Sequence, residues 1–370
     1  MSGAGASPQT LDARILAAIG AWHADGSALD DGAFDALALA LYRYQVATNA
    51  PYARFAAAAG FAAREPATWR DIPAVPASAF RDAALATFDP SRAELTFHTS
   101  GSTGATPGTH FLQRAALYDA ALLAGFDRFM LGDGARLRFL NLVPDPRERP
   151  HSSLGYMMGR VARERGAGDA AFYLRGDAVD AGALCGDLAR AIADGAPVCI
   201  AGTAFAFVAV LDALAESRVT FACTPGSRIM ETGGFKGRTR VVERATLYRE
   251  ASARLGIPLD AIVAEYGMTE LSSQYYDDPA GRDHIEPRVK VAPPWLRAIV
   301  VDGDGRPVPE GVVGAIRHVD LANRGSVIAV ETEDLGALVG PAGLVLFGRE
   351  QGAELRGCSL DAETLLARRG

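Results

Sequence analysis

Lysine is almost missing from this chain, which has two lysines, Lys236 and Lys290, among 37 basic residues. The positive charge is therefore nearly all arginine, and a mechanism that needs a catalytic amine has few candidates. An excess of positive charge is lacking as well, since 44 acidic residues give a net charge of −7. Nucleic-acid-binding domains usually carry a basic excess or stripe. The composition thus argues against a DNA or RNA partner, without excluding one.

Cysteine pairs and long apolar runs are also lacking. The four cysteines form no C-x-x-C pair and have no zinc-site spacing. The longest apolar stretch, near Ala204–Leu214, is interrupted by Asp212, and it is shorter than the ~20 residues of a membrane span. Met1–Thr10 has neither the basic nor the apolar region of a secretory signal. We therefore expect a cytoplasmic protein with reduced thiols and no membrane span.

Apolar material for a core is ample, at 49% of 370 residues. The length suggests two domains or one large α/β domain with additions. Residues 1–93 show helical spacing, as in Leu11–Ala21 and Phe34–Val46. Residues 94–295 alternate β-like runs, such as Thr220–Cys223, with helical stretches, which favours βαβ units and a largely parallel sheet. Residues 296–370 read as a β subdomain, with β-like runs at 296–301 and 343–347, followed by a short C-terminal segment. We therefore predict an α/β fold with a helical N-terminal portion and a small β subdomain.

A loop rich in glycine and small hydroxylated residues occupies Thr99–Thr109. It follows a β-like run at Glu94–His98 and precedes a helical pattern at Phe111–Met130. Glycines let backbone N–H groups approach phosphate oxygens, and the hydroxyls add further donors. The plain alternative is a flexible turn, and no Gly-Lys-Ser/Thr sequence makes this loop a Walker motif.

Three further segments carry polar chemistry. Residues 265–270 (EYGMTE) follow a β-like run, where α/β sheets place ligands, and Glu270 could hold Mg²⁺. Residues 331–336 (ETEDLG) offer carboxylates that could accept hydrogen bonds from ribose hydroxyls, and residues 348–358 begin with Gly348-Arg349. Taken singly, each has a plain alternative: a strand end, an exposed turn aspartate or a solvated arginine.

In this order and at these spacings, the four segments resemble the adenylate-forming superfamily of acyl- and aryl-CoA ligases, peptide-synthetase adenylation domains and firefly-type luciferases. The loop is similar to the family's T-S-G-[ST]-T-G-x-P, and residues 266–270 are similar to its Y-G-x-T-E. The later segments resemble T-G-D-L-G and the hinge G-R-x-x-D-x-x-K-x-x-G, and Gly233-Gly234 stand where its adenine-side glycines are expected. The resemblance covers residues 94–358.

One branch is more similar than the others. Residues 144–158, 233–236 and 356–360 (RGCSL) resemble the acyl-protein synthetases of bacterial luminescence. That family activates a fatty acid with ATP, holds it on a cysteine near the C-terminus and passes it to an acyl-CoA-reductase-type partner.

The resemblance implies a role for each matching residue. ATP and Mg²⁺ would be the cofactors and a carboxylic acid the substrate, with Glu270 as the catalytic carboxylate and metal ligand. Lys236 and Cys358 would complete the catalytic set, as a cation and a nucleophilic thiol. The nucleotide-binding residues would be Thr99, Ser100, Gly101, Ser102, Thr103, Gly104, Gly233, Gly234, Tyr266, Gly267, Thr269, Asp334 and Arg349.

The chain also departs from the family pattern. No lysine follows Lys290, although most members carry a catalytic lysine in a further C-terminal domain, which we expect to be absent here. Another cation would then face the developing charge, and Arg349, Arg356 and Lys236 are the candidates. The other three cysteines, at 185, 199 and 223, lie in apolar patterns and are expected in the core.

Three functions remain open at this stage. The first is an acyl-protein synthetase, an AMP-forming acid–thiol ligase that acylates Cys358 or a partner thiol. The second is a stand-alone acyl- or aryl-CoA ligase of the phenylacetate-ligase kind, which delivers the acyl group to CoA or an acyl carrier protein. The third is a non-catalytic nucleotide-binding protein, against which the intact loop, Glu270 and Asp334 argue.

Overall fold

The computed structural model describes residues 7–99, 106–233, 242–282, 288–340 and 342–349. The chain divides into two compact units. The first unit comprises Met1–Ala124, Met268–Gln274 and Val291–Gly370, and the second comprises Gly125–Gly267 and Tyr275–Lys290. The regional boundaries expected from the sequence, 1–93, 94–295 and 296–370, stay predictions.

The first unit contains an antiparallel sheet in the order β12, β13, β14, β15, with the short strand β1 parallel to β14. Turn residues separate these strands; for example, Gly305 has a φ of 74°, which glycine adopts without strain. The strand bounds are β1 (Val75–Pro76), β12 (Leu296–Val301), β13 (Gly314–Asp320), β14 (Ala329–Val339) and β15 (Gly343–Arg349).

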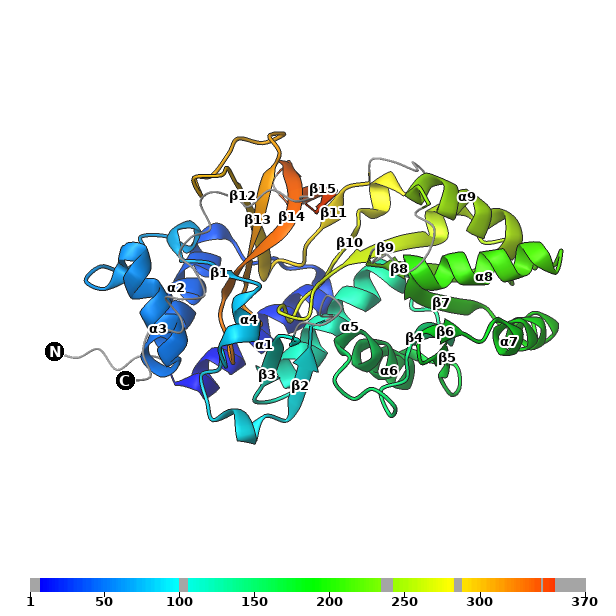
Figure 1. Cartoon of the computed structure of the whole chain (residues 1–370), viewed down its shortest axis with the longest axis horizontal. Helices are drawn as coiled ribbons and strands as arrows, with labels where there is room; N and C mark the ends of the chain where they lie inside the picture. The colour runs from blue at the N-terminus through cyan, green and yellow to red at the C-terminus, as the bar shows by residue number, and fades with distance from the viewer. Residues whose placement is uncertain (1–6, 100–105, 234–241, 283–287, 341, 350–370) are drawn as a thin grey trace. The chain divides into compact units, whose positions relative to one another are not determined.

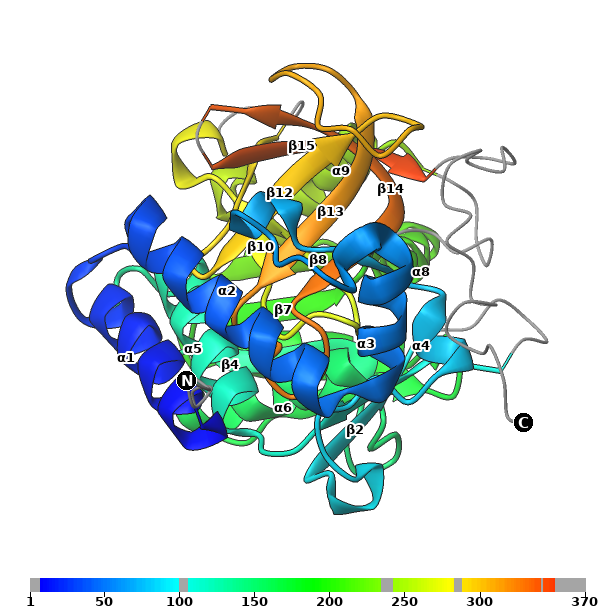
Figure 2. The same cartoon turned by 90° about the vertical axis from the view of Figure 1, so that its left-hand side faces the viewer.

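Helices from the N-terminal part of the chain belong to the same unit and lie beside its sheet (Figure 2). Ser7 caps α1 by accepting a hydrogen bond from Thr10 N at 3.1 Å. The ring of Trp22 in α1 meets that of Trp295 edge-on at 5.2 Å. Gln45 of α2 donates to Asn323 O at 2.8 Å, so a buried amide fixes α2 to the loop after β13. The helices are α1 (Pro8–Asp25), α2 (Asp31–Thr48), α3 (Ala50–Ala56), η1 (Ala57–Phe61), η2 (Trp69–Asp71), α4 (Ala79–Asp82) and η3 (Pro90–Arg92).

The glycine-rich loop joins two strands rather than a strand and a helix. β2 (Leu95–His98) pairs antiparallel with β3 (Thr109–Leu112), and α5 begins only at Ala116. The helix expected from Phe111 was therefore wrong over its first turn. Burial alternates along β3, with His110 and Leu112 inside, and this period of two is that of a strand.

The second unit contains a mixed sheet in the order β10, β9, β8, β7, β4, β5, β6. The strands from β9 to β5 are parallel, and β10 and β6 pair antiparallel at the two ends of this order. Their bounds are β4 (Arg138–Pro144), β5 (Ala171–Arg175), β6 (Ala178–Val179), β7 (Val198–Thr203), β8 (Arg228–Thr232), β9 (Ile262–Tyr266) and β10 (Tyr275–Asp277); β11 (Lys290–Val291) lies at the unit boundary.

Helices cover both faces of this sheet (Figure 1). Buried residues of α7, α8 and α9 form one core with Leu140, Leu142, Ile200 and Ile229. On the other face the last turns of α5 contribute Phe126, whose ring lies 5.9 Å from that of Phe139. The helices are α5 (Ala116–Met130), which enters from the first unit, α6 (Ser153–Arg165), α7 (Ala181–Ala193), α8 (Ala204–Glu216), α9 (Arg244–Leu255), η4 (Leu259–Ala261) and η5 (Pro279–Gly281). The predicted α/β class is confirmed.

One expected strand, Thr220–Cys223, is not a strand. Its backbone donates instead to the end of α9, from Phe221 to Arg254 O at 2.7 Å and from Cys223 to Leu255 O at 3.0 Å. These bonds satisfy carbonyls that a helix leaves open at its C-terminus. Among the described residues, no helix combines the length and the apolar character that crossing a membrane requires.

Candidate active site

Two hydrogen bonds close the base of the glycine-rich loop. Thr99 N donates to Gly108 O at 2.9 Å, and Gly108 N donates to the Thr99 hydroxyl at 2.8 Å. A side chain at Gly108 would meet the Phe80 carbonyl carbon and Thr99 Cγ2 at 3.1 Å, so glycine allows this close approach. The base of the loop is thus fixed on β2 and β3. The predicted phosphate-binding residues Ser100, Gly101, Ser102, Thr103 and Gly104 lie outside the described residues.

The segment that carries Thr269 and Glu270 is tied to β3 by His110. The Nδ1 atom of His110 lies 2.7 Å from Thr269 O. Since a carbonyl only accepts, Nδ1 is the protonated nitrogen in this bond. His110 is 1% exposed, and burial lowers its pKa to about 4, which keeps the ring neutral at pH 7. The loop base and the Glu270 segment are therefore joined within the first unit.

The last residue of β13 and the loop after it anchor Glu270 and its neighbours. Asn323 Nδ2 donates to Glu270 O at 2.8 Å, and the Glu270 side chain is largely buried. Asp320 accepts from Ser272 N and from the Ser273 hydroxyl, each at 2.9 Å. Burial raises the pKa of Asp320 to about 6. These bonds fix the chain at Glu270 and in the residues that follow it.

The predicted ribose segment lies on β14. Glu331 is not a free acceptor, because Arg317 donates to it, and Arg317 also donates to Gly305 O at 3.0 Å. Asp334 is partly exposed, and its backbone N–H donates to the Thr332 hydroxyl at 3.1 Å. In the β14–β15 ladder, Asp334 stands opposite Arg349; the side chain of Arg349 lies outside the described part.

The other predicted residues belong to the second unit. Gly233 follows β8 with a φ of 69°, is exposed, and has no atom within 4 Å of where a Cβ would stand. At the same end of the sheet the Thr232 hydroxyl donates to the Glu265 carboxylate. Burial raises the pKa of Glu265 to about 7. Tyr266 ends β9, and Gly267 follows it directly into the Thr269–Glu270 segment. Gly234 lies outside the described residues.

Lys290, one of the two lysines, has a structural environment. It is 2% exposed, and its Nζ donates to Asp277 at 2.5 Å and to Ala264 O at 3.0 Å. Arg288 donates to the same carboxylate at 2.9 Å. Lys290 thus forms a buried ion pair and is not an available catalytic amine. Lys236 lies outside the described residues.

The cysteines within the described chain are poor nucleophiles. Burial raises the pKa of Cys199 to about 12 and that of Cys223 to about 11, and it also raises the pKa of the half-buried Cys185. A thiol must ionise to attack, so these three side chains are core groups. Cys358 and Arg356 lie outside the described residues.

No cluster of three or more His, Cys, Asp or Glu side chains suited to a metal ion occurs within the described ranges. A single carboxylate such as that of Glu270 is enough for the magnesium ion of a nucleotide enzyme. Mg²⁺ takes one or two protein carboxylates there and completes its shell with phosphate oxygens and water. The donor chemistry of Thr99, Thr269 and Glu270 therefore fits a magnesium nucleotide.

Sequence reasoning missed the residues that support Glu270. His110 directly follows the loop, but its partner Thr269 is 159 positions away, and Asn323 and Asp320 belong to no motif. His151, in the segment 144–158 that resembles the luminescence enzymes, is exposed in the turn before α6.

No protein-family model matches this chain, and no curated protein matches it in sequence. Solved structures do match its fold. ATP-bound MatB from Rhodopseudomonas palustris is similar with a TM-score of 0.50 and 18% identity, over 71% of this chain and 49% of that one. McyG A-PCP, complexed with phenylalanyl-adenylate, is similar with a TM-score of 0.50 and 19% identity, over 71% and 42%. A double mutant of o-succinylbenzoate CoA synthetase (MenE) from Bacillus subtilis, bound with a product analogue, is similar with a TM-score of 0.50 and 18% identity. The match covers 71% of this chain and 50% of that one.

The chain thus spans about half the length of the solved structures it matches. At these identities the likeness shows the fold alone. The chain has the α/β fold of adenylate-forming enzymes.

Proposed function

We propose that this chain activates a carboxylic acid with ATP as an acyl-adenylate and then transfers the acyl group to a thiol. One observation carries the proposal: His110 joins the closed base of the glycine-rich loop to the segment that bears Glu270. Strand β3 thereby connects the proposed phosphate-binding loop to the segment whose carboxylate is proposed to bind Mg²⁺. The fold likeness to MatB and McyG supports the same class of reaction.

In the proposed first step, a substrate carboxylate oxygen attacks the α-phosphorus of ATP. A new O–P bond forms, the bond to the β-phosphate oxygen breaks, and pyrophosphate leaves with the electron pair. Bound Mg²⁺ would neutralise charge on the phosphates, and Glu270 is its proposed ligand. Thr99, Ser100, Gly101, Ser102, Thr103, Gly104 and Thr269 are the proposed phosphate-binding residues.

Further residues have proposed roles toward the nucleoside. Gly233 and Gly234 would flank the adenine, and their lack of side chains would leave room for it. Tyr266 and Gly267 would form the strand end beside it. Asp334 would accept hydrogen bonds from the ribose hydroxyls, with Arg349 next to it. Lys236, Arg349 and Arg356 are the candidate cations for the developing charge, because Lys290 is committed to Asp277.

In the proposed second step a thiolate attacks the acyl carbon and AMP leaves. Cys358 is the proposed thiol, since burial raises the pKa of each of the other three cysteines. A fatty acid is the proposed substrate, and an acyl-CoA-reductase-type protein would take the acyl group onward. The similarity of residues 356–360 to the acyl-protein synthetases of luminescence supports this finer assignment.

The acceptor is tested with radiolabelled fatty acid and ATP on a denaturing gel. We expect hydroxylamine-labile label on the protein, which is lost in Cys358→Ser and kept in Cys185→Ser. Label that appears only on added CoA or carrier protein would instead establish the alternative ligase of the phenylacetate-ligase kind. That alternative is kept because McyG A-PCP and MenE, which share the fold, have a carrier-protein module and a CoA product analogue in their structures.

A further inference from the structure

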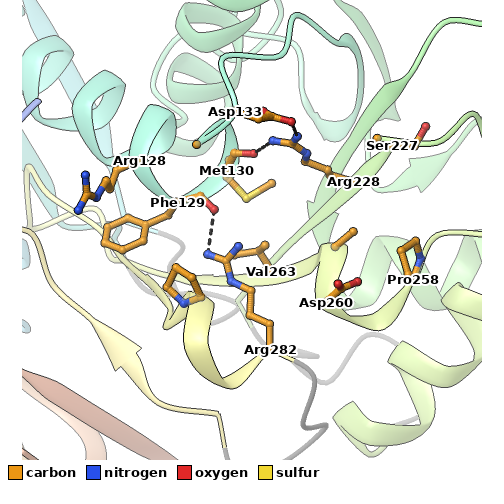
Figure 3. A pocket seen from close by; sticks show the side chains of 14 residues that line it. Arg128, Phe129, Met130, Asp133, Ser227, Arg228, Pro258, Asp260, Val263 and Arg282 are labelled. Atoms are coloured by element: carbon orange, nitrogen blue, oxygen red, sulfur yellow. Dashed lines mark hydrogen bonds and ion pairs between the residues drawn. The ribbon is translucent and has the colours of Figure 1, made fainter. Parts of the chain in front are cut away.

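The second unit contains a cavity of about 410 Å³ that none of the proposed catalytic residues lines (Figure 3). It lies where α5 ends at Met130 and where β8 begins at Arg228; Val263, near the start of β9, also lines it. Parallel strands place their carboxyl ends at the opposite edge, where Thr232 ends β8. The cavity is thus separate from the predicted nucleotide-binding residues Gly233 and Tyr266.

Two guanidinium groups reach the end of α5 from two different elements (Figure 3). Arg228 of β8 donates to Met130 O and to Asp133. Arg282, which follows η5, donates through Nη2 to Phe129 O at 2.8 Å and to Asp277 O at 3.0 Å. These bonds satisfy carbonyls at the helix C-terminus. They use only part of each donor set: within the described chain, Nη1 of Arg282 makes no hydrogen bond.

Arg282 is partly desolvated and forms no ion pair with the described residues. Its hydrogen-bond partners are main-chain carbonyls. Burial lowers its pKa, while Asp277 and Asp278 oppose this effect and Arg288 and Arg228 add to it. Arg128, Asp133 and Asp260 also line the cavity, and Asp133 is paired with Arg228. A partly desolvated cation beside others of the same sign is stabilised by an anion that accepts several N–H bonds.

Apolar side chains form part of the wall, among them Phe129, Pro258 and Pro279. The volume exceeds that of a bare oxyanion and falls in the range of small-molecule sites. We propose that this cavity binds a small phosphate monoester, with its phosphate between Arg228 and Arg282 and its organic group against Phe129 and the two prolines. This site is independent of the proposed adenylation.

Calorimetric titration tests the proposal with three probes: phenyl phosphate, inorganic phosphate and phenol. We expect phenyl phosphate to bind, inorganic phosphate to bind more weakly, and phenol to show no binding. Arg282→Gln should weaken phenyl phosphate binding about tenfold or more, which is the effect of losing a charge-assisted contact. Arg249→Gln, which removes an exposed arginine of α9, is the matched control and should leave binding unchanged.

A phosphate probe could also enter the predicted loop site, so Thr99→Ala separates the two. Binding that survives Thr99→Ala and falls in Arg282→Gln supports the cavity. Binding that is lost in Thr99→Ala, or that is equal in Arg282→Gln and the unaltered chain, overturns it, as does equal binding of phenol. If Arg282→Gln does not fold, hydrogen exchange of the unaltered chain decides. Phenyl phosphate must then protect amides in residues 126–134, and unchanged exchange there contradicts the proposal.

Discussion

Burial decides which single side chains of this molecule can take part in chemistry. Lys290 and Asp277 are both nearly fully buried and paired, so their charges support the fold. Cys199 is buried, and its raised pKa keeps the thiol protonated, so it does not supply a thiolate nucleophile. Glu270 is also largely buried, and Asn323 holds its backbone carbonyl; its carboxylate is the proposed magnesium ligand. Composition could indicate the scarcity of lysine but could not show which lysine is committed.

Glu270→Gln should lower ATP–pyrophosphate exchange by about 100-fold, because a neutral amide replaces the proposed magnesium ligand while the hydrogen bond to Glu270 O remains. Exchange rates at saturating ATP measure this effect. Glu216→Gln, at the exposed end of α8, is the control and should retain full activity. Equal rates for the two variants would remove Glu270 from the account.

His318 should make the protein less stable as the pH falls. It is fully buried, and burial lowers its pKa to about 3, whereas an unfolded histidine titrates near 6.5. Between pH 7 and 5 the unfolded chain therefore binds a proton that the folded chain does not, and the free energy of unfolding falls by about 2 kcal/mol for this residue. Urea unfolding of His318→Gln should show a shallower pH dependence than the unaltered chain. His23→Gln, an exposed control, should keep the steeper one; identical slopes for all three proteins would disprove this.

At the scale of elements, local periodicity predicted much of what the structure contains. The apolar spacing in Leu11–Ala21 and Phe34–Val46 predicted α1 and α2, and the runs near residues 296–301 and 343–347 predicted β12 and β15. The prediction was wrong at β3, since Phe111 and Leu112 fit a helix start as well as an alternating strand. Thr220–Cys223 has a strand composition but bonds to the end of α9. Such partners are distant in sequence, so no local pattern contains them.

The hairpin of β2 and β3 should act on catalysis through His110. His110→Ala removes the donor to Thr269 O and should reduce exchange about tenfold or more while raising the KM for magnesium ATP. His110→Asn, which keeps a donor near Nδ1, should recover most of the rate. If the residue only supported the fold, both variants would lower the Tm, and the rate per folded molecule and the KM would stay unchanged.

Two glycines should respond in opposite directions to alanine. In Gly202→Ala the new Cβ would lie 2.7 Å from Leu142 Cβ between β7 and β4, and the overpacked strands should lose about 1–3 kcal/mol of unfolding free energy. Gly20→Ala on α1 has no atom within 4 Å of the new Cβ, and the higher helix propensity should stabilise by about 0.5–1 kcal/mol. Denaturant unfolding measures both changes. Destabilisation by both variants, or by neither, would contradict the packing described here.

At the scale of the whole molecule, the fold and the function rest on different support. The fold is shared with solved structures of which this chain spans about half the length. The proposed function rests on motifs whose order could be read from the sequence. It also rests on the contacts of His110 and Asn323, which hold the Thr269–Glu270 segment and join it to the base of the glycine-rich loop. The order of the motifs was predictable because each is local. The way in which Thr269 is anchored was not, because it depends on a contact across 159 positions.

Carboxylate-dependent exchange of radiolabelled pyrophosphate into ATP tests the central claim most directly, since it reports acid activation whatever the acyl acceptor. With fatty and aryl acids supplied in turn, we expect exchange that requires Mg²⁺, rises with at least one acid and is nearly abolished in Glu270→Gln. Exchange that is absent with every acid, in a protein that nevertheless binds ATP, would contradict the account and leave a nucleotide-binding protein without adenylation activity.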